Sequence, residues 1–137
     1  MDKLQKYLKN NKQTIVYFYP RDNTPGCTIE AHDFSLHKET FNKNWIWIVG
    51  ISKDYEESHC KFIENHNLTI DLISDADLSL HKQFGAWWEK NMYWKIVQWT
   101  IRSTFLLDQN WKIIKEWRNV KANGHVDKLI KELELRN

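Results

Sequence analysis

The sequence predicts an α/β domain in which helices pack against a central sheet. Two runs, TIVYFY at residues 14–19 and WIWIVGIS at residues 45–52, are rich in β-branched and aromatic residues and nearly free of charge. Continuous apolar runs of this kind are typical of strands covered on both faces. Helical patterns follow both runs, and the alternation of strands with helices is the pattern of a layered α/β fold.

Two helices are predicted from apolar residues that recur at helical spacing. The first spans residues 25–40 and lies between the two strands; its apolar positions are Cys27, Ala31, Phe34 and Phe41. The second lies in SKDYEESHCKFIENH, where one face carries Tyr55, His59, Phe62, Ile63 and His66.

The last third of the chain predicts a hairpin followed by a closing helix. STFLLD (103–108) and KIIKEWR (112–118) read as two strands that turn at Asp108-Gln109-Asn110. The segment GHVDKLIKELEL has the apolar spacing of an amphipathic helix, with Val126, Leu129, Ile130 and Leu133. Neither a repeat nor a linker interrupts the pattern, so one domain is expected over residues 1–137.

Composition excludes several classes of protein. The chain has 137 residues, 42% of them hydrophobic, and a formal charge of +2 with dispersed lysines, which gives no reason to expect nucleic-acid binding. Its apolar runs are too short for a signal peptide or a membrane span. Two cysteines cannot form a disulfide scaffold, so we expect a cytoplasmic protein with free thiols.

One turn gathers residues that are otherwise rare in this chain. YFYPRDNTPGCTIEAHDF, residues 17–34, holds both prolines and one of the two cysteines. Thr24 suits the N-cap of the first helix and Pro25 its first position, so Cys27 falls in the first turn. Free amides and the helix dipole favour a thiolate there, and Gly26 lets a small molecule approach. From spacing alone, an inert core cysteine remains an equal alternative.

The same segment resembles the active-site segment of peroxiredoxins of the bacterioferritin-comigratory, or peroxiredoxin Q, group. That signature is Pro, three residues, Thr or Ser, two residues, Cys, and Pro20, Thr24 and Cys27 match it. The resemblance extends through five further segments in order along nearly the whole chain: GISKDYEESHCKF, LISDADLSLHKQFGAW, MYWK, IRSTFLLD and GHVDKLIKEL.

The resemblance implies a thioredoxin-like fold and a thiol peroxidase that needs neither metal nor haem. Cys27 would be the peroxidatic cysteine, which becomes a sulfenic acid. Thr24 would hydrogen-bond the sulfur or the peroxide, and Pro20 would shield the sulfur. Arg102 would hold the thiolate and the developing charge, and Glu30 would orient Arg102. Taken singly, Glu30 and Arg102 would be ordinary surface residues. Only the series of segments that match the family along the chain favours these roles.

One departure from the family concerns the resolving cysteine. Many members carry it five residues after the peroxidatic one, where this chain has His32. Cys60 is the remaining internal candidate, although relatives with a distant resolver place it at the position aligned with Ile63. Cys60 as resolver and Cys60 as a free surface thiol remain open alternatives, because joining it to Cys27 would require helix ends to unwind. The reductant would accordingly be thioredoxin or another thiol, and close relatives are mostly monomers.

Two further departures concern the start of the chain and its tryptophans. Family members normally begin with an additional β-hairpin, which is either missing from this protein or not included in the sequence. Trp88, Trp94 and Trp99 stand where relatives often have glycine, in the loop region expected to lead to Arg102. They would narrow the peroxide entrance or, as the commoner use of tryptophan, serve in packing.

Three other functions are alternatives to a peroxidase. A thioredoxin-type reductase would need Cys-x-x-Cys, which is absent here. A zinc site from His32, His37, His59 and Cys60 lacks any established ligand spacing. The stronger rival is a non-catalytic binding or chaperone-like protein on a peroxiredoxin scaffold, which would not require the set Pro20, Thr24, Cys27, Glu30 and Arg102.

Overall fold

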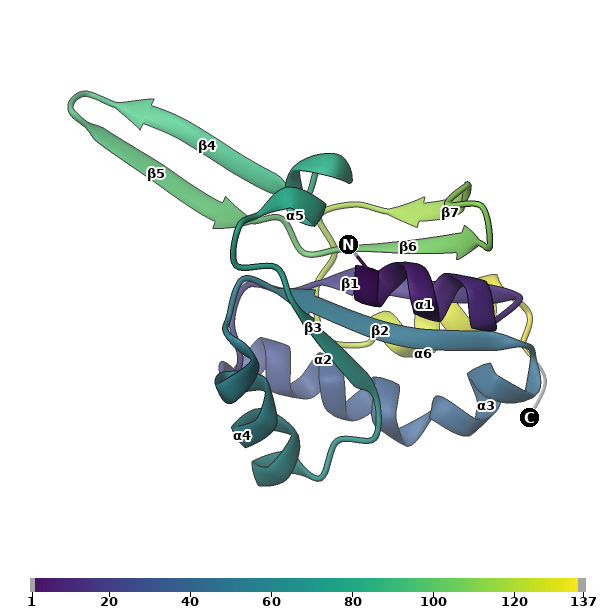
Figure 1. Ribbon diagram of the computed structural model, residues 1–137. Coiled ribbons are helices and arrows are strands. Elements are labelled where there is room, and N and C mark those ends of the chain that lie inside the picture. Colours follow the sequence, from purple (N-terminus) through teal and green to yellow (C-terminus); the bar gives the residue numbers. More distant parts are fainter. Residues whose placement is uncertain (1, 136–137) are drawn as a thin grey trace.

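A mixed five-stranded sheet forms the centre of the computed structural model, which describes residues 2–135 (Figure 1). Its strand order is β3-β2-β1-β6-β7. β2 is parallel to β1 and β3, whereas β6 is antiparallel to β1 and β7. The strands are β1 (Gln13–Phe18), β2 (Ile46–Ser52), β3 (Asp71–Ser74), β6 (Ser103–Asp108) and β7 (Ile113–Trp117).

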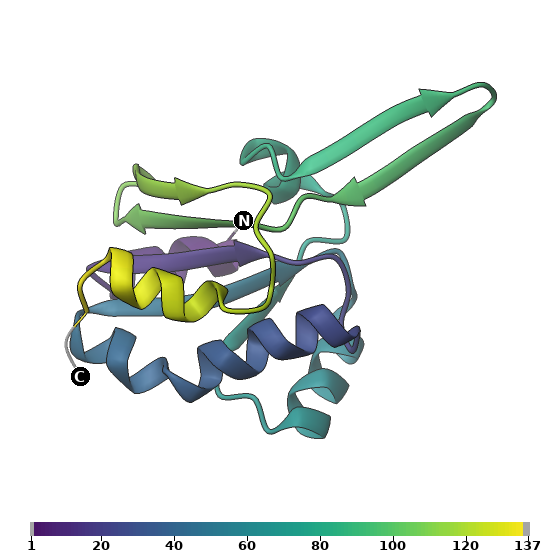
Figure 2. The same cartoon turned by 180° about the vertical axis from the view of Figure 1, so that it is seen from behind.

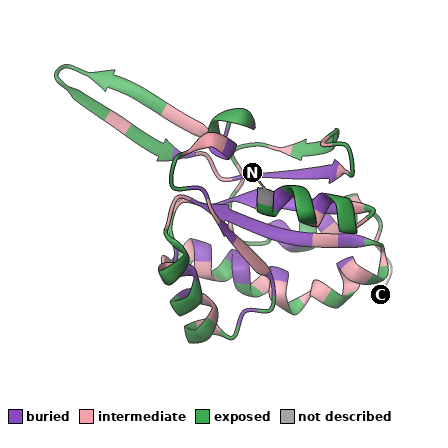
Figure 3. Cartoon of the chain, viewed as in Figure 1, coloured by how far each residue is buried: buried purple, intermediate pink, exposed green. Residues whose placement is uncertain are grey.

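Helices cover both faces of the sheet, and each face has its own apolar cluster. One cluster joins the sheet to α2 (Pro25–Leu36), α3 (Lys38–Lys43), α4 (Glu56–His66) and α6 (His125–Glu132). The other joins it to α1 (Asp2–Asn10) and α5 (Ser79–Gln83). Figure 3 shows the central strands buried between these layers.

Strand β1 shows how the sequence produces this sandwich of layers. Ile15 and Tyr17 point into the first cluster, while Val16 and Phe18 point into the second. Successive side chains alternate between the faces of a strand, so a strand covered on both faces must be apolar throughout. The predicted double cover of this run is confirmed.

Two predicted helical boundaries are wrong. The helix predicted over residues 25–40 ends at Leu36, because His37 leaves helical geometry with φ −101° and ψ 10° and separates α2 from α3. Tyr55, predicted on the buried face of the next helix, precedes α4 and is 73% exposed. The predicted hairpin of β6 and β7 and the closing helix α6 are both present.

The segment before Arg102, expected to be a loop, forms a second hairpin, so the prediction of a loop is wrong. β4 (Trp87–Met92) and β5 (Lys95–Thr100) pair antiparallel in a sheet of their own. The hairpin projects away from the body of the molecule in Figures 1 and 2. At its base, the buried His81 contacts Asp75 (Nδ1–Oδ2 2.7 Å) and Thr100 (Nε2–Oγ1 3.1 Å).

No helix among residues 2–135 combines the length and the apolar composition needed to cross a membrane.

Gly50 in β2 is required by the packing of Tyr17, and we expect Gly50→Ala to destabilise the fold. A Cβ atom there would lie 2.7 Å from Tyr17 Cζ and 2.8 Å from Leu72 Cδ2. Overpacking of this kind costs about 1–3 kcal/mol. Urea unfolding measures the loss, and the exposed Lys115→Ala serves as a control expected within about 0.5 kcal/mol of the parent. Equal stability of the two variants would contradict the prediction.

Candidate active site

Cys27 lies in the first turn of α2, as the sequence predicts. β1 ends at Phe18, and the following loop reaches Thr24, whose extended backbone (φ −81°, ψ 153°) makes it the N-cap residue. Pro25 begins the helix, where its missing N–H removes no hydrogen bond. Cys27 is 1% exposed and joins the first apolar cluster.

Arg102 and Glu30 complete a chain of contacts that ends on the sulfur of Cys27. Arg102 Nη2 donates to Cys27 Sγ at 3.3 Å, and Arg102 Nη1 donates to Glu30 Oε1 at 2.6 Å. Glu30 is fully buried, and the Arg102 side chain is 15% exposed. A fixed guanidinium at this distance stabilises negative charge on the sulfur or on an oxygen beside it.

Gly26 makes room for this arginine. A Cβ atom at Gly26 would lie 3.3 Å from Arg102 Nη2 and 3.7 Å from Ala122 Cβ. The sequence predicts that Gly26 admits a small molecule to the sulfur. The structure shows in addition that the absent side chain admits the guanidinium.

Thr24 and Pro20 border the turn without contacting the sulfur through a hydrogen bond. The Thr24 hydroxyl donates to the carbonyl of Arg21 at 3.1 Å and caps no helix amide. Pro20 is half-buried at the bend after β1. The predicted contacts of Thr24 with sulfur or peroxide, and the shielding by Pro20, therefore stay predictions.

Burial governs the charge of the groups behind the sulfur. It raises the pKa of Glu30 to about 7, although Arg102 acts in the opposite direction. Burial would lower the pKa of Arg102, but the charges of Glu30 and Cys27 outweigh it and raise that pKa. Glu30 Oε2 and Tyr17 Oη are both buried without a hydrogen-bond partner. Glu30 thus holds its proton far more readily than a surface glutamate does.

A buried polar network fixes the loop that leads to Cys27, and the sequence did not reveal it. Asp22 Oδ2 accepts from Ser58 Oγ and meets His59 Nδ1, both at 2.7 Å, while Tyr19 Oη donates to Asp22 Oδ1 at 2.6 Å. Burial would raise the pKa of Asp22, but the hydrogen bonds from His59, Tyr19 and Ser58 lower it. The detectable signal was His59 on an apolar helix face, since buried polar groups require partners.

Cys60 lies apart from these contacts. Both cysteines are free, Cys27 buried and Cys60 exposed. Cys60 faces solvent from α4, whereas its neighbour His59 is 3% exposed and faces the loop. His32, at the position of the common resolving cysteine, is exposed on α2.

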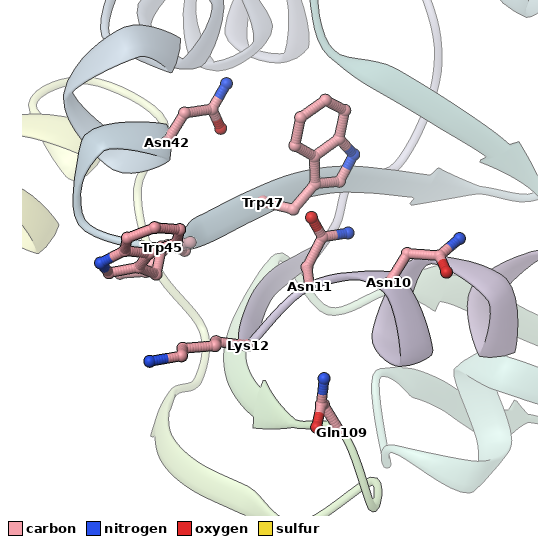
Figure 4. A pocket seen from close by; sticks show the side chains of 8 residues that line it. Asn10, Asn11, Lys12, Asn42, Trp45, Trp47 and Gln109 are labelled. Carbon is pink, nitrogen blue, oxygen red and sulfur yellow. The ribbon is translucent and has the colours of Figure 1, made fainter.

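Other features of the surface do not involve the predicted site residues. Among residues 2–135, no group of three or more His, Cys, Asp or Glu side chains could hold a metal ion. A hollow of about 380 Å³ lies near the start of β1 and β2, at the strand ends remote from Cys27 (Figure 4). Asn10, Asn42, Trp45 and Gln109 are among the residues that line it.

We expect Glu30→Gln to gain stability relative to the parent as pH rises. Glu30 titrates near 4.5 when unfolded and near 7 when folded. Between these values the folded state keeps a proton that the unfolded chain has released, so the contribution of Glu30 to the unfolding free energy falls with rising pH. Glutamine retains an acceptor for Arg102 but does not titrate.

Urea unfolding at about pH 4, 6 and 8 measures the unfolding free energies of the parent and of Glu30→Gln. From pH 4 to pH 8, the value for the variant minus that for the parent should rise by roughly 3 kcal/mol. The exposed Glu39→Gln is the control and should show no comparable trend. A difference that stays constant with pH would contradict the assignment of a raised pKa to Glu30.

Comparison with known proteins agrees with this geometry. Residues 3–116 match the model of the AhpC/TSA family. Peroxiredoxin Bcp of Bacillus subtilis is 42% identical over 132 residues, which are 96% of this chain and 83% of that protein. A putative peroxiredoxin of Mycobacterium tuberculosis is 44% identical over 124 residues, covering 90% of this chain and 79% of its own.

Solved structures show the same relationship. The bacterioferritin comigratory protein of Xanthomonas campestris, studied for alkyl peroxide reduction, has a TM-score of 0.84 and 39% identity, covering 90% of this chain and 79% of that one. A peroxiredoxin Q mutant of Xylella fastidiosa has a TM-score of 0.85 and 37% identity, covering 96% and 80%. The predicted thioredoxin-like fold and the predicted resemblance are confirmed, and the chain belongs to the AhpC/TSA family, among its Bcp or peroxiredoxin Q members.

Proposed function

We propose that this protein is an antioxidant thiol peroxidase that reduces hydrogen peroxide and organic hydroperoxides at Cys27. The contact of Arg102 with both Cys27 Sγ (3.3 Å) and Glu30 (2.6 Å) carries the proposal. Close relatives are peroxiredoxins, and one neighbouring structure concerns alkyl peroxide reduction. A binding scaffold would have no need for a buried cation held against a cysteine.

The first step is a displacement at oxygen. The Cys27 thiolate attacks one peroxide oxygen, an S–O bond forms, and the O–O bond breaks. Sulfur is oxidised to the sulfenic acid, and the second oxygen takes a proton and leaves as water or an alcohol. Arg102 lies where charge develops on the departing oxygen, and Glu30 holds its guanidinium in place. Thr24 and Pro20 would border the approaching peroxide.

We propose further that an external thiol, thioredoxin or another, resolves the sulfenic acid. A disulfide requires Cα atoms within about 7 Å and side chains that face one another. Cys60 faces solvent, and the bonds of Asp22 to Ser58 and His59 hold that part of α4 against the loop. An external thiol instead attacks the sulfenic sulfur, releases water and forms a mixed disulfide that a second thiol reduces. The enzyme would act as a cytoplasmic monomer.

Intact mass after one equivalent of hydrogen peroxide tests both parts. Within seconds we expect the fully reduced protein to gain one oxygen atom. Cys27→Ser should gain none on this timescale, and Cys60→Ser should behave as the parent does, because only the Cys27 sulfur is oxidised in the first step.

Each other outcome has a defined meaning. Loss of two hydrogens in the monomer would show that Cys60 resolves Cys27 and would overturn the one-cysteine cycle. An unchanged mass would overturn the peroxidase and favour the non-catalytic binding protein.

A further inference from the structure

A basic hollow of about 290 Å³ lies where the connection after β7 meets the start of α6. Figure 2 shows this connection running from β7 to α6. Four of the lining residues are basic or can become so, and no aspartate or glutamate lines the hollow: Arg118, Lys121, His125 and Lys128.

The same connection packs against the reactive turn. The backbone N–H of Val120 donates to the carbonyl of Arg102 at 2.9 Å. On the other side, Ala122 lies 3.7 Å from the position of a Cβ at Gly26, the residue before Cys27. A molecule held in the hollow therefore sits beside the segment that supports the sulfur and its arginine.

The start of α6 adds polar groups suited to an anion. Gly124 is the N-cap residue, contributes no capping side chain, and has open space where its Cβ would be. His125 is 3% exposed, and its Nε2 lies 2.7 Å from Thr104 Oγ1. Its Nδ1 has no protein partner within residues 2–135, and His125 lines the hollow. Amides of a first helical turn can bind a carboxylate, and so can Nδ1 of His125 in the tautomer that carries the proton there, with Nε2 accepting from the Thr104 hydroxyl.

Nearby charges leave the hollow positive. Burial, Lys128 and Arg102 together lower the pKa of His125 to about 4. Asp127 meets His37 at 3.5 Å and Glu132 accepts from Trp117, both away from the lining residues, whereas Glu116 pairs at 3.4 Å with Arg118, one of the lining cations. The positive charge of the hollow therefore rests on Lys121 and Lys128. The lysines keep their charges without acidic partners in the hollow.

We infer that this hollow binds the carboxylate of a small acidic molecule that reacts at Cys27. This inference rests on the proposed peroxidase function. The carboxylate belongs either to an acidic organic hydroperoxide or to an acidic thiol that reduces the sulfenic acid, and the two sources are separated by experiment.

Matched charged and neutral compounds provide the test. Rates of the parent and of Lys121→Ala/Lys128→Ala are compared with linoleic acid hydroperoxide and its methyl ester, and with glutathione and its diethyl ester, in which both carboxylates are esterified. The double variant should lose about tenfold in kcat/KM for the acid of one pair, since one charged contact is worth about 1.4 kcal/mol, and little for the ester. The pair affected identifies the source. Lys131→Ala, exposed on the same helix but outside the hollow, is the control.

Equal effects on acid and ester, or no effect, would overturn the anion site. Failure of the parent to react with hydrogen peroxide would instead overturn the proposed function. A readout independent of activity is the shift of the Gly124 and Val126 amide resonances on titration with inorganic phosphate. The shift should occur in the parent and weaken in the double variant, and its absence in the parent would contradict the site.

A second and independent observation concerns the tryptophans, which number eight against four glycines. Three of them donate an indole N–H: Trp47 to Asp71 at 2.9 Å, Trp87 to Glu89 at 2.8 Å, and Trp117 to Glu132. Within residues 2–135 the other five make no such bond: Trp45, Trp88, Trp94, Trp99 and Trp111. The fold thus uses the indole donor of three tryptophans and, within residues 2–135, of none of the other five.

Two of these five have backbone geometry that belongs to glycine. Trp45, with φ 66°, directly follows the C-cap residue of α3, and its N–H donates to Asn42 at 3.1 Å. Glycine is the usual residue at that position. Trp111, with φ 68°, ends the turn from Asp108 to Lys112, where glycine is again usual. Figure 4 shows Trp45 at the edge of its hollow, and its side chain is among the exposed apolar ones (69%).

The remaining three lie on the projecting hairpin. Trp94 is 89% exposed in the two-residue turn after Met92. The left-handed φ of this turn (59°) lies at Tyr93, so glycine at Trp94 is argued from the family resemblance alone. Trp88 and Trp99 pair directly across the hairpin and stack with ring centroids 3.6 Å apart. The family resemblance places glycine at these same three positions.

We infer that all five positions are glycine in the protein that its own cell makes. UGA differs by one base from the glycine codon GGA, and it is read as tryptophan in some genetic codes and as glycine in others. If the gene has UGA at these positions, a code that reads UGA as tryptophan yields this sequence. A code that reads UGA as glycine yields glycine at all five positions.

The codons and the native protein decide the matter. We expect UGA codons at the five positions and UGG codons at Trp47, Trp87 and Trp117. In the native protein, peptide masses should show glycine at the five positions. UGG at the five positions would overturn the inference. In recombinant protein, Trp45→Gly should raise the urea midpoint of unfolding, because the left-handed residue at this exposed position no longer carries a side chain, whereas Trp47→Gly should lower it.

Discussion

The bridge from Glu30 through Arg102 to Cys27 is the interaction on which the active site depends. Its members come from α2 and from the segment before β6, and Cys27 and Arg102 are 75 positions apart in the sequence. The antiparallel pairing of β6 with β1 places Ser103 opposite Phe18, so Arg102 reaches the loop that leads to the helix. A register slip of one residue would turn the side chains of β6 to the opposite faces. The two apolar clusters, which fix that register, therefore also fix the arginine.

The bridge lies beside buried polar atoms that have no hydrogen-bond partner, which lowers the stability of the fold locally. Glu30 Oε2 and Tyr17 Oη are buried without partners, and desolvation of a carboxyl disfavours its charged form. Replacing such a group with an apolar one often stabilises a fold. The surrounding apolar residues on both sheet faces offset this local cost, and their dense packing keeps the guanidinium in one position. Functional sites commonly contain residues that lower the stability of the fold.

Much of this arrangement could be predicted from the sequence because its signals are local. The apolar runs predict β1 and β2, and Thr24-Pro25 locates the start of α2 and therefore Cys27. The roles of Arg102 and Glu30 could be predicted only from the family resemblance, since a charged residue in a sequence does not by itself show that it is buried. α1, β3 and the β4–β5 hairpin were missed, because a short polar helix, a four-residue strand and an exposed ribbon carry weak periodicity.

The Asp22–His59 contact has a consequence for motion as well as for position. It joins the reactive loop to α4, so a local unfolding that separates the two segments must break this buried contact. Breaking a buried pair of an acid and a histidine is costly, which makes the open form rare. Cys27 is 1% exposed in the closed form, so a protein thiol such as thioredoxin would reach its sulfur only when the two segments separate. Under the external resolution proposed above, the frequency of this opening would set the rate at which a protein reductant restores the thiol.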